Sequence, residues 1–414
     1  MDPSEVAREL KARAAALGFS ACRITSAEPF AAERAALVAR IDAGLEEGMG
    51  WLSRERALVS TDPAALVPGA KSLVSVAMPY GRPTHRWRGG VRGKIARYAW
   101  ARDYHSTLKS RLAELRAFLL DQAPAGHCAV VVDTGRVVDR AVAVRSGVGW
   151  YGKNAMVLTA EAGSWVVLGE LVTTIALPPD EPLAKGCGHC VRCLECCPTG
   201  ALVAPGVVDS RRCISYLTIE HRGAIPCALR PLMGTWIFGC DVCQEVCPVD
   251  GALPTVAADA LAPVLDPEPD LVELLRSTRQ EFRSRYHHTP VARAGWAGLL
   301  RNVCVALGNV RDPAAVPALV EALRHEEPLV RGHAAWALGR IGGEDARRAL
   351  EAALADEDDQ DVRRELDGAL RALGRSELGA EARPSHLAAA AATDAADVTP
   401  RRPPPRHTTG RALR

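Results

Sequence analysis

The feature that most constrains the fold is a cysteine-rich segment in the middle of the chain. Ten of the 13 cysteines lie between Cys187 and Cys247, and the densest stretch, CGHCVRCLECCPTG, occupies residues 187–200. Cysteine at this density staples a small secreted domain, binds a metal or holds an iron–sulfur cluster. Local clustering within a chain of 414 residues favours metal binding in a reducing compartment over disulfides.

The spacing of these cysteines is that of a bacterial two-cluster ferredoxin. The motif C-x2-C-x2-C-x3-C-P runs from Cys187 to Pro198. In such proteins its first three cysteines bind one [4Fe–4S] cluster and its fourth binds the other. The partner motif CDVCQEVCP begins at Cys240 and is one cysteine short, because Ile237 stands at the expected position. Cys213 is the best candidate for the missing ligand. A structural zinc site would need only four ligands in two pairs, so we expect clusters.

These motifs predict two [4Fe–4S] clusters with interleaved ligands. The first cluster is assigned Cys187, Cys190, Cys193 and Cys247. The second cluster is assigned Cys197, Cys213, Cys240 and Cys243. Cys196 and Cys227 then remain as spare thiols, with an exchange of ligands as the alternative. A module of this kind conducts electrons but has no substrate pocket of its own, so another part of the chain must receive them.

Charge and hydropathy bear on whether the protein binds nucleic acid, is secreted or spans a membrane. The formal net charge is only +2, so any basic surface for nucleic acid must be local. The N-terminal stretch MDPSEVARELKARAAALGF is charged and lacks the apolar core of a signal peptide. No apolar run reaches the roughly 18 residues of a transmembrane helix. We therefore expect a cytoplasmic protein without a membrane attachment.

Residues 1–180 are predicted to mix helices and strands. Apolar runs predict buried strands at 72–80, 127–135 and 164–177, and a helix at 136–147. Asp133 follows the apolar run of the second strand, where it can face a pocket and act as an acid with a raised pKa. The alternative is that Asp133 caps the helix that begins near Arg136. The sequence alone favours neither interpretation.

The C-terminal part of the chain contains a repeat. The stretch VALGNVRDPAAVPALVEAL is echoed by WALGRIGGEDARRALEAAL, which predicts pairs of short helices in a small HEAT-like α-solenoid. An ordinary helical bundle is the alternative. The end of the chain is rich in alanine and proline and is predicted to be disordered. The expected organisation is a multidomain α+β protein. Its parts are an N-terminal α/β domain (1–180), a ferredoxin-like module (181–253), a connecting segment (254–298), HEAT-like repeats (299–375) and a disordered tail (376–414).

Three motifs together resemble the epoxyqueuosine reductase family. They are VVDTGRVVDRAVAVRSGVGWYGKN, then RRCISYLTIEHRG joined to the ferredoxin module, and GCDVCQEVCP. The resemblance covers about residues 5–375, including the HEAT-like unit. It implies that the N-terminal domain binds cobalamin, that the module holds two [4Fe–4S] clusters, and that the enzyme reduces epoxyqueuosine to queuosine at the wobble position of tRNA. It also implies a monomer that takes electrons from an external low-potential donor.

The resemblance also assigns residues by position. Asp133 matches the proton donor in the family's VDTG motif. The expected corrinoid contacts are Arg56, Ala96, Asp133, Arg140, Val157, Leu168, Ser215 and Asp241. The expected tRNA contacts are Arg293, Arg301 and Asn302, although the family's basic run is reduced here to HHTPVARAGWAGLLRN. No D-x-H-x-x-G motif is present, so we expect no histidine ligand to cobalt and a structural role for His105.

Two other functions compete with this one. A related cobalamin and iron–sulfur reductase could act on a small molecule, as a dehalogenase does, but the HEAT-like unit then has no evident use. An electron carrier tethered to a protein-binding solenoid would leave residues 1–180 without a role and predicts no bound corrinoid.

Overall fold

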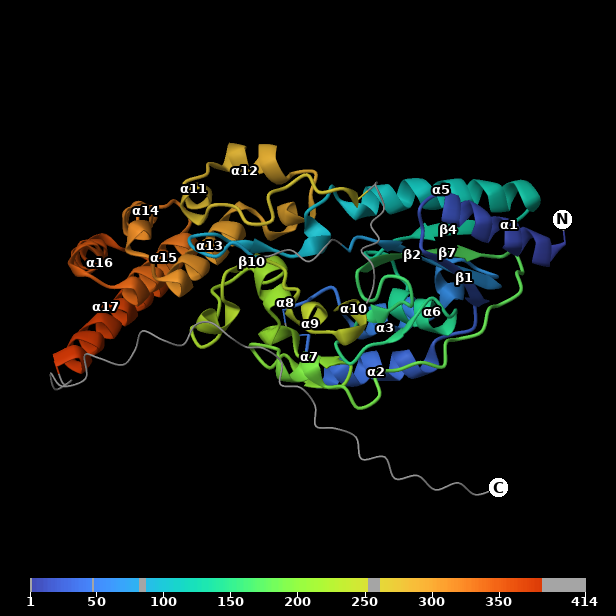
Figure 1. Cartoon of the computed structure of the whole chain (residues 1–414), viewed down its shortest axis with the longest axis horizontal. Coiled ribbons are helices and arrows are strands. Elements are labelled where there is room, and N and C mark those ends of the chain that lie inside the picture. The colour runs from blue at the N-terminus through green and yellow to red at the C-terminus, as the bar shows by residue number, and fades with distance from the viewer. Residues whose placement is uncertain (1, 47, 82–86, 252–260, 382–414) are drawn as a thin grey trace, which may run out of the picture.

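The computed structural model describes residues 2–46, 48–81, 87–251 and 261–381 (Figure 1). It shows an α/β region, a cysteine-rich module and a helical C-terminal region, as the sequence predicts. Most of the predicted tail, 382–414, lies outside the described residues, but its first residues do not fit the prediction. The last helix continues to Glu381, so residues 376–381 are helical. Within the described part of the chain, no helix has the length and apolar character needed to cross a bilayer.

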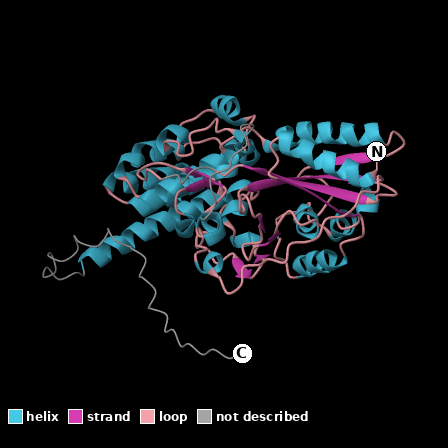
Figure 2. Ribbon diagram, turned by 45° about the vertical axis from the view of Figure 1, so that its right-hand side comes forward, coloured by secondary structure: helices cyan, strands magenta, loops and turns pink. Residues whose placement is uncertain are grey.

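The N-terminal region is built on a four-stranded antiparallel sheet in the order β1-β2-β7-β4. The strands are β1 (Ala21–Ser26), β2 (Ser72–Pro79), β4 (Cys128–Val131) and β7 (Val166–Thr173). The three predicted strands are therefore confirmed. Figure 2 shows these strands crossing the right half of the molecule between two layers of helices.

Helices cover both faces of this sheet (Figure 1). On one face lie α1 (Pro3–Ala16) and α5 (Tyr104–Gln122), which share a hydrophobic core with alternate residues of β2 and β7. On the other face lies α6 (Asp139–Arg145), which packs on side chains of opposite parity. The helix begins at Asp139, three residues later than predicted, because the segment before it forms a turn. The other helices here are α2 (Ala31–Asp42), α3 (Arg54–Ser60) and α4 (Pro63–Leu66).

The cysteine-rich module is made of short elements. Its helices are α7 (Arg192–Glu195), α8 (Ile214–Ile219), α9 (Val242–Glu245) and α10 (Pro248–Gly251), and its hairpin joins β8 (Leu202–Ala204) to β9 (Val207–Val208). A second hairpin, β5 (Trp150–Tyr151) with β6 (Val157–Leu158), lies in the loop before β7.

One strand of the cysteine-rich module is tied to the N-terminal region. Strand β10 (Trp236–Phe238) pairs in parallel with β3 (Lys94–Ile95). Gly239 follows with φ +68°, and a Cβ there would approach the Ala96 side chain to 2.5 Å. A larger residue would push the two segments apart.

The C-terminal region stacks helices against one another, which confirms the predicted HEAT-like architecture (Figure 1). Its helices are α11 (Leu271–Leu275), α12 (Arg279–Tyr286), α13 (Trp296–Val310), α14 (Val316–Ala322), α15 (Pro328–Ile341), α16 (Glu344–Asp356) and α17 (Gln360–Glu381). They bury one continuous core that also takes in Ile95 and Phe238. The repeats are thus continuous with the strand that joins the other two regions.

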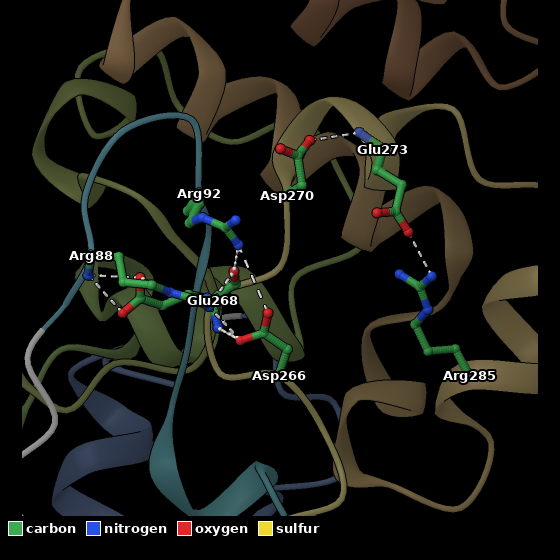
Figure 3. A network of polar contacts seen from close by, with 7 residues as sticks. All are labelled: Arg88, Arg92, Asp266, Glu268, Asp270, Glu273 and Arg285. Atoms are coloured by element: carbon green, nitrogen blue, oxygen red, sulfur yellow. Dashed lines mark hydrogen bonds and ion pairs between the residues drawn. The ribbon is translucent and has the colours of Figure 1, made fainter.

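The connecting segment is fastened by a network of ion pairs (Figure 3). Both carboxylate oxygens of Glu268 accept from the backbone N–H of Arg88, at 2.9 and 2.8 Å. The Arg88 guanidinium donates to Asp266 at 2.6 Å, and Arg92 donates to the Glu268 carbonyl at 2.9 Å. Because the Glu268 side chain is almost fully buried, this contact resists competition from water. It fixes the approach to strand β3.

Two residues predicted to contact tRNA lie instead inside the protein. Arg301 and Asn302 are 1% and 0% exposed on α13. Arg301 donates to the carbonyls of Leu217, His221 and Gly223 at 2.7–2.8 Å. Asn302 donates to two further carbonyls, at 2.9 Å each. The prediction of a surface contact is wrong for both residues, since their polar groups are used to join the helical region to α8 and β10.

Replacement of Arg301 by alanine should therefore destabilise the fold. The change leaves three buried carbonyl oxygens without donors, and each orphaned acceptor costs about 1–3 kcal/mol. We expect the free energy of unfolding to fall by at least about 3 kcal/mol in denaturant titrations. Arg348→Ala on α16 is the matched control, because that side chain is 67% exposed. Equal stability of the two variants would show that the Arg301 contacts contribute nothing.

Candidate active site and cluster-binding module

A cavity of about 370 Å³ lies where the sheet, the loop before β7 and the cysteine-rich module meet. Its walls combine apolar side chains with a few polar groups, as ligand sites commonly do. Seven of the eight predicted corrinoid contacts line it, namely Ala96, Asp133, Arg140, Val157, Leu168, Ser215 and Asp241. These residues are spread over more than 140 positions of sequence, so only the fold brings them together.

Four cysteines line the same cavity. They are Cys197, Cys213, Cys240 and Cys243, the four that the sequence assigns to one cluster. Burial raises the pKa of the Cys243 thiol, and nearby Cys213 and Cys197 raise it further. Of the four cysteines assigned to the other cluster, none is among the residues that line this cavity. One predicted cluster site therefore faces the cavity and the other does not.

The remaining predicted ligands form the second group. Burial raises the pKa of the Cys193 thiol, and interactions with Cys187, Cys190 and Cys247 add to this effect. Among the described residues, no three His, Cys, Asp or Glu side chains stand close enough to hold a single metal ion.

Asp133 lies on the loop after β4 in an unusual backbone conformation. Its φ is +43°, which few residues other than glycine adopt. Its carboxylate accepts a hydrogen bond from the Tyr104 hydroxyl at 2.7 Å and lies 3.2 Å from Nε2 of His105. It does not cap the following helix, because the N-cap of α6 is Val138. The structure therefore rejects the capping interpretation and turns Asp133 towards the start of α5.

The interaction between Asp133 and His105 shifts the pKa of Asp133 in the direction opposite to the one predicted. Burial acts to raise the pKa of Asp133, but hydrogen bonds from His105 and Tyr104 outweigh it and leave the pKa below its usual value. The prediction of a raised pKa is thus wrong. Asp103, 2.7 Å from Nδ1 of His105, and then Asp133 raise the pKa of that imidazole to about 9. At neutral pH the proton therefore resides on His105, next to an ionised Asp133.

Sequence analysis missed the contribution of Tyr104 and His105. The stretch RDYHSTL carries an acid, a phenol and an imidazole in consecutive positions at the start of a helix. Asp103 caps α5, since its carboxylate accepts from the backbone N–H of His105 at 3.0 Å. The cap fixes the first turn of α5, and this places both side chains beside Asp133. A run of polar residues at a helix start was the available signal.

Two arginines hold the walls of the site in different ways. Arg140 lines the cavity and donates to the Ala155 carbonyl at 2.7 Å. Arg56 does not line it, unlike the prediction for a corrinoid contact. Its guanidinium donates to the carbonyls of Gly135 and Thr134, at 2.9 and 3.2 Å. Arg56 therefore supports the loop that carries Asp133.

Of the three predicted tRNA contacts, Arg293 alone is on the surface. Its side chain is 48% exposed and forms an ion pair with Glu220. Asp133 and Tyr98 are among the groups whose charges raise the pKa of this arginine, after the hydrogen bond to Glu220.

Comparisons with known proteins agree with this geometry. Residues 61–134 match the family model described as epoxyqueuosine reductase QueG, DUF1730. Curated epoxyqueuosine reductases include one from Bacillus cereus, 35% identical over 91% of this chain and 99% of the relative, and one from Escherichia coli, 36% identical over 82% and 90%. The chain belongs to the epoxyqueuosine reductase family. Residues 186–250 match a 4Fe-4S double cluster binding domain, and residues 297–371 match HEAT repeats.

Solved structures of the family have the same fold. An epoxyqueuosine reductase bound to an epoxyqueuosine-modified tRNA-Tyr stem loop is 34% identical, with a TM-score of 0.84 over 89% of this chain and 99% of that one. The Bacillus subtilis enzyme, also 34% identical with a TM-score of 0.83, was solved with an aspartate-bearing catalytic loop swung out of its active site. The curated relatives are epoxyqueuosine reductases, and one solved relative is bound to a tRNA stem loop, so the electron-carrier and small-molecule alternatives are not retained.

The His105 pairing predicts a pH-dependent stability. Because the folded pKa of about 9 exceeds the ordinary value of 6.5, the pairing stabilises the protein fully below pH about 6.5 and is lost as pH rises through about 9. Asp103→Asn should remove the larger cause and return the His105 pKa towards 6.5 in an NMR titration. It should also flatten the loss of stability over this pH range. An unchanged His105 titration would show that Asp103 does not hold the proton there.

Proposed function

We propose that this chain reduces epoxyqueuosine to queuosine in tRNA, with cobalamin in the cavity and electrons delivered by two [4Fe–4S] clusters. One observation carries the proposal. The cavity is lined both by Asp133, a candidate acid, and by the four cysteines assigned to one cluster. A cluster bound by these cysteines and the candidate acid would face the same cavity, as reductive removal of an oxygen atom requires.

The residues of the cavity suit a corrinoid. Ala96, Val157 and Leu168 offer apolar contact to the face of a macrocycle. Arg140, Ser215 and Asp241 offer polar groups for the amide and phosphate groups at its rim. Bound cobalamin would supply a strongly reducing cobalt centre beside the cluster.

Electrons would reach this cavity through the interleaved cysteine groups. We call the four cysteines that line the cavity the inner group and the other four predicted ligands the outer group. Cys193 of the outer group contributes to the raised pKa of Cys243 in the inner group, so the two groups are neighbours. Clusters held by these two groups of cysteines would supply a path for electrons from an external low-potential donor to the cavity. We propose that a single chain carries out the reaction as a monomer.

Protons would come from the start of α5. Removal of the epoxide oxygen as water consumes two electrons and two protons. Asp133 faces the cavity, and His105 holds a proton within 3.2 Å of its carboxylate. His105 protonates Asp133, and Asp133 delivers that proton to the oxygen. Tyr104 orients the carboxylate through its 2.7 Å hydrogen bond.

The substrate is the modified nucleotide of a tRNA, as the relative bound to a tRNA stem loop indicates. Arg293 is exposed beside the active-site region and can pair with a phosphate once Glu220 is displaced. Each predicted region of the chain has its own role in this proposal. Residues 1–180 hold cobalamin, residues 181–253 hold the clusters, residues 254–298 connect them to the repeats, and residues 299–375 support the tRNA.

The ligand assignment can be tested by counting iron. Anaerobic reconstitution should give about eight irons per chain, since each cluster carries four. Cys213→Ala should lose about half of them, because it removes a ligand of the inner cluster. Cys227→Ala is the matched control, since its exposed thiol lies outside both groups. If Cys213→Ala kept all the iron while Cys196→Ala lost half, the assignment would be wrong.

The proton donor can be tested by a variant that keeps its shape. Asparagine tolerates the positive φ at position 133 and has the same shape as aspartate, but Asp133→Asn has no acidic proton to donate. Turnover should fall by roughly 10²-fold or more, with iron content and corrinoid binding unchanged. In the wild type, turnover should fall as pH rises through about 9, where His105 loses its proton. Near wild-type turnover of Asp133→Asn would exclude Asp133 as the acid.

A further inference from the structure

A chain of hydrogen bonds runs from the cysteine-rich module to the wall of the cavity. Its members, Asp250, Ser164, Gln244 and Tyr80, are all buried. The Asp250 carboxylate accepts from the backbone N–H and from the hydroxyl of Ser164, each at 2.6 Å. The Gln244 amide donates to the hydroxyl and the carbonyl of Ser164, at 3.1 Å each, and to the Tyr80 hydroxyl at 3.2 Å. Ser164, Gln244 and Tyr80 line the cavity, so the chain of hydrogen bonds ends at its wall.

The local structure holds both ends of this chain of hydrogen bonds in place. Gly163 has φ +57°, and a Cβ there would collide with the Asp250 carboxylate, so glycine is needed for the carboxylate to reach Ser164. At the other end, the backbone N–H of Tyr80 donates to the Trp165 carbonyl at 2.8 Å and continues the pairing of β2 with β7. The Tyr80 ring meets the Trp165 ring edge-on, with centroids 6.1 Å apart. These contacts fix the position of the phenol.

The direction of the hydrogen bonds follows from the carbonyl of Ser164. A backbone carbonyl only accepts, so the Gln244 atom that faces it is the amide nitrogen and not the amide oxygen. An amide nitrogen only donates, so the Tyr80 hydroxyl accepts through its oxygen. The phenol hydrogen must then point to another acceptor, and no residue that the structure describes supplies one. A buried hydroxyl at the cavity wall thus has an unused donor, which a bound molecule can satisfy.

We propose that the Tyr80 hydroxyl donates a hydrogen bond to a peripheral amide carbonyl of the corrinoid, and that Gln244 is a positioning residue that turns the phenol hydrogen into the cavity. The inference rests on the proposed function only in taking cobalamin as the occupant. A corrinoid carries amide carbonyls around its rim, and these accept the kind of hydrogen bond that Tyr80 offers. In the sequence, Gln244 stands between Cys243 of the inner group and Cys247 of the outer group. The cofactor is favoured over the tRNA as the acceptor because the hydrogen bonds reach Tyr80 from the segment that carries the cluster ligands.

Replacement of Tyr80 by phenylalanine removes the donor and little else. Corrinoid binding is measured by a visible-range titration of the iron-loaded protein without tRNA. The Kd should rise roughly fivefold, the scale of one neutral hydrogen bond, while iron content and thermal stability match the wild type. Tyr286→Phe is the matched control, since that tyrosine is also buried but belongs to the core of the repeats. An unchanged corrinoid Kd in Tyr80→Phe would overturn the inference, and so would a weaker affinity for tRNA alone, which would place the acceptor on the substrate.

The positioning role of Gln244 can be tested by a double-mutant cycle. Gln244→Met has a similar length but donates no hydrogen bond, so it should raise the corrinoid Kd about two- to threefold in the wild-type background. In the Tyr80→Phe background it should change nothing, because its effect passes through the phenol. Ser164→Ala, which lies outside the cysteine motifs, should show the same dependence on Tyr80 and decides the question if Gln244→Met loses iron. An equal loss of affinity in both backgrounds would overturn the positioning role, because the replaced side chain would then act on the cofactor without Tyr80.

Activity separates this inference from the proposed function. A wild-type protein that binds corrinoid with this dependence on Tyr80, but does not reduce epoxyqueuosine in tRNA, would overturn the proposed function alone. A wild-type protein that reduces epoxyqueuosine, with a corrinoid Kd that does not depend on Tyr80, would overturn the inference alone.

Discussion

The contact between Gly239 and Ala96 sets the spacing on which the active site depends. The positive φ of Gly239 and the absence of its Cβ let the end of β10 approach the end of β3. Cys240 and Asp241 follow immediately, so the same contact places one cluster ligand and one cavity wall. Because Gly239 has no Cβ, the two segments can approach closely, and this sets the distance between the electron-carrying module and the sheet. The buried polar groups of Arg301 and Asn302 then hold this junction from the side of the repeats.

The N-terminal region holds carboxyl groups in two kinds of environment. Asp133 has donors, the phenol of Tyr104 and the imidazole of His105, and it is therefore ionised. Glu170 is buried between apolar strands without a donor, and burial raises its pKa well above its usual range. Groups of the same chemical type thereby have pKa values shifted in opposite directions, because hydrogen-bond donors stabilise the ionised form and burial without a donor destabilises it.

The sequence predicted most of the architecture because its strongest signals are local. The cysteine spacing is set by the reach of adjacent side chains to one cluster, and the structure gathers those cysteines in the two expected groups. Predictions failed where a residue's surroundings come from distant segments. Arg301 looks like a surface charge, but carbonyls some 80 positions earlier bury it. Asp133 looks like an acid in an apolar site, but its partners lie about 30 positions earlier. The surroundings of these two residues could not be predicted from their neighbours in the sequence.

The crossing of ligands between the two cysteine motifs has a consequence for maturation of the protein. Under the proposed assignment, each cluster takes ligands from both motifs, so neither cluster assembles until the two segments meet. The chain between these segments includes β10, which pairs with β3 of the N-terminal region. Under this assignment, cluster binding would also help to hold the module against the sheet. Loss of either cluster to oxygen would then weaken the attachment of the module to the sheet as well as interrupt electron transfer. A cell that lacks iron would accumulate protein in which the module is loosely attached, and this protein would be more susceptible to proteolysis.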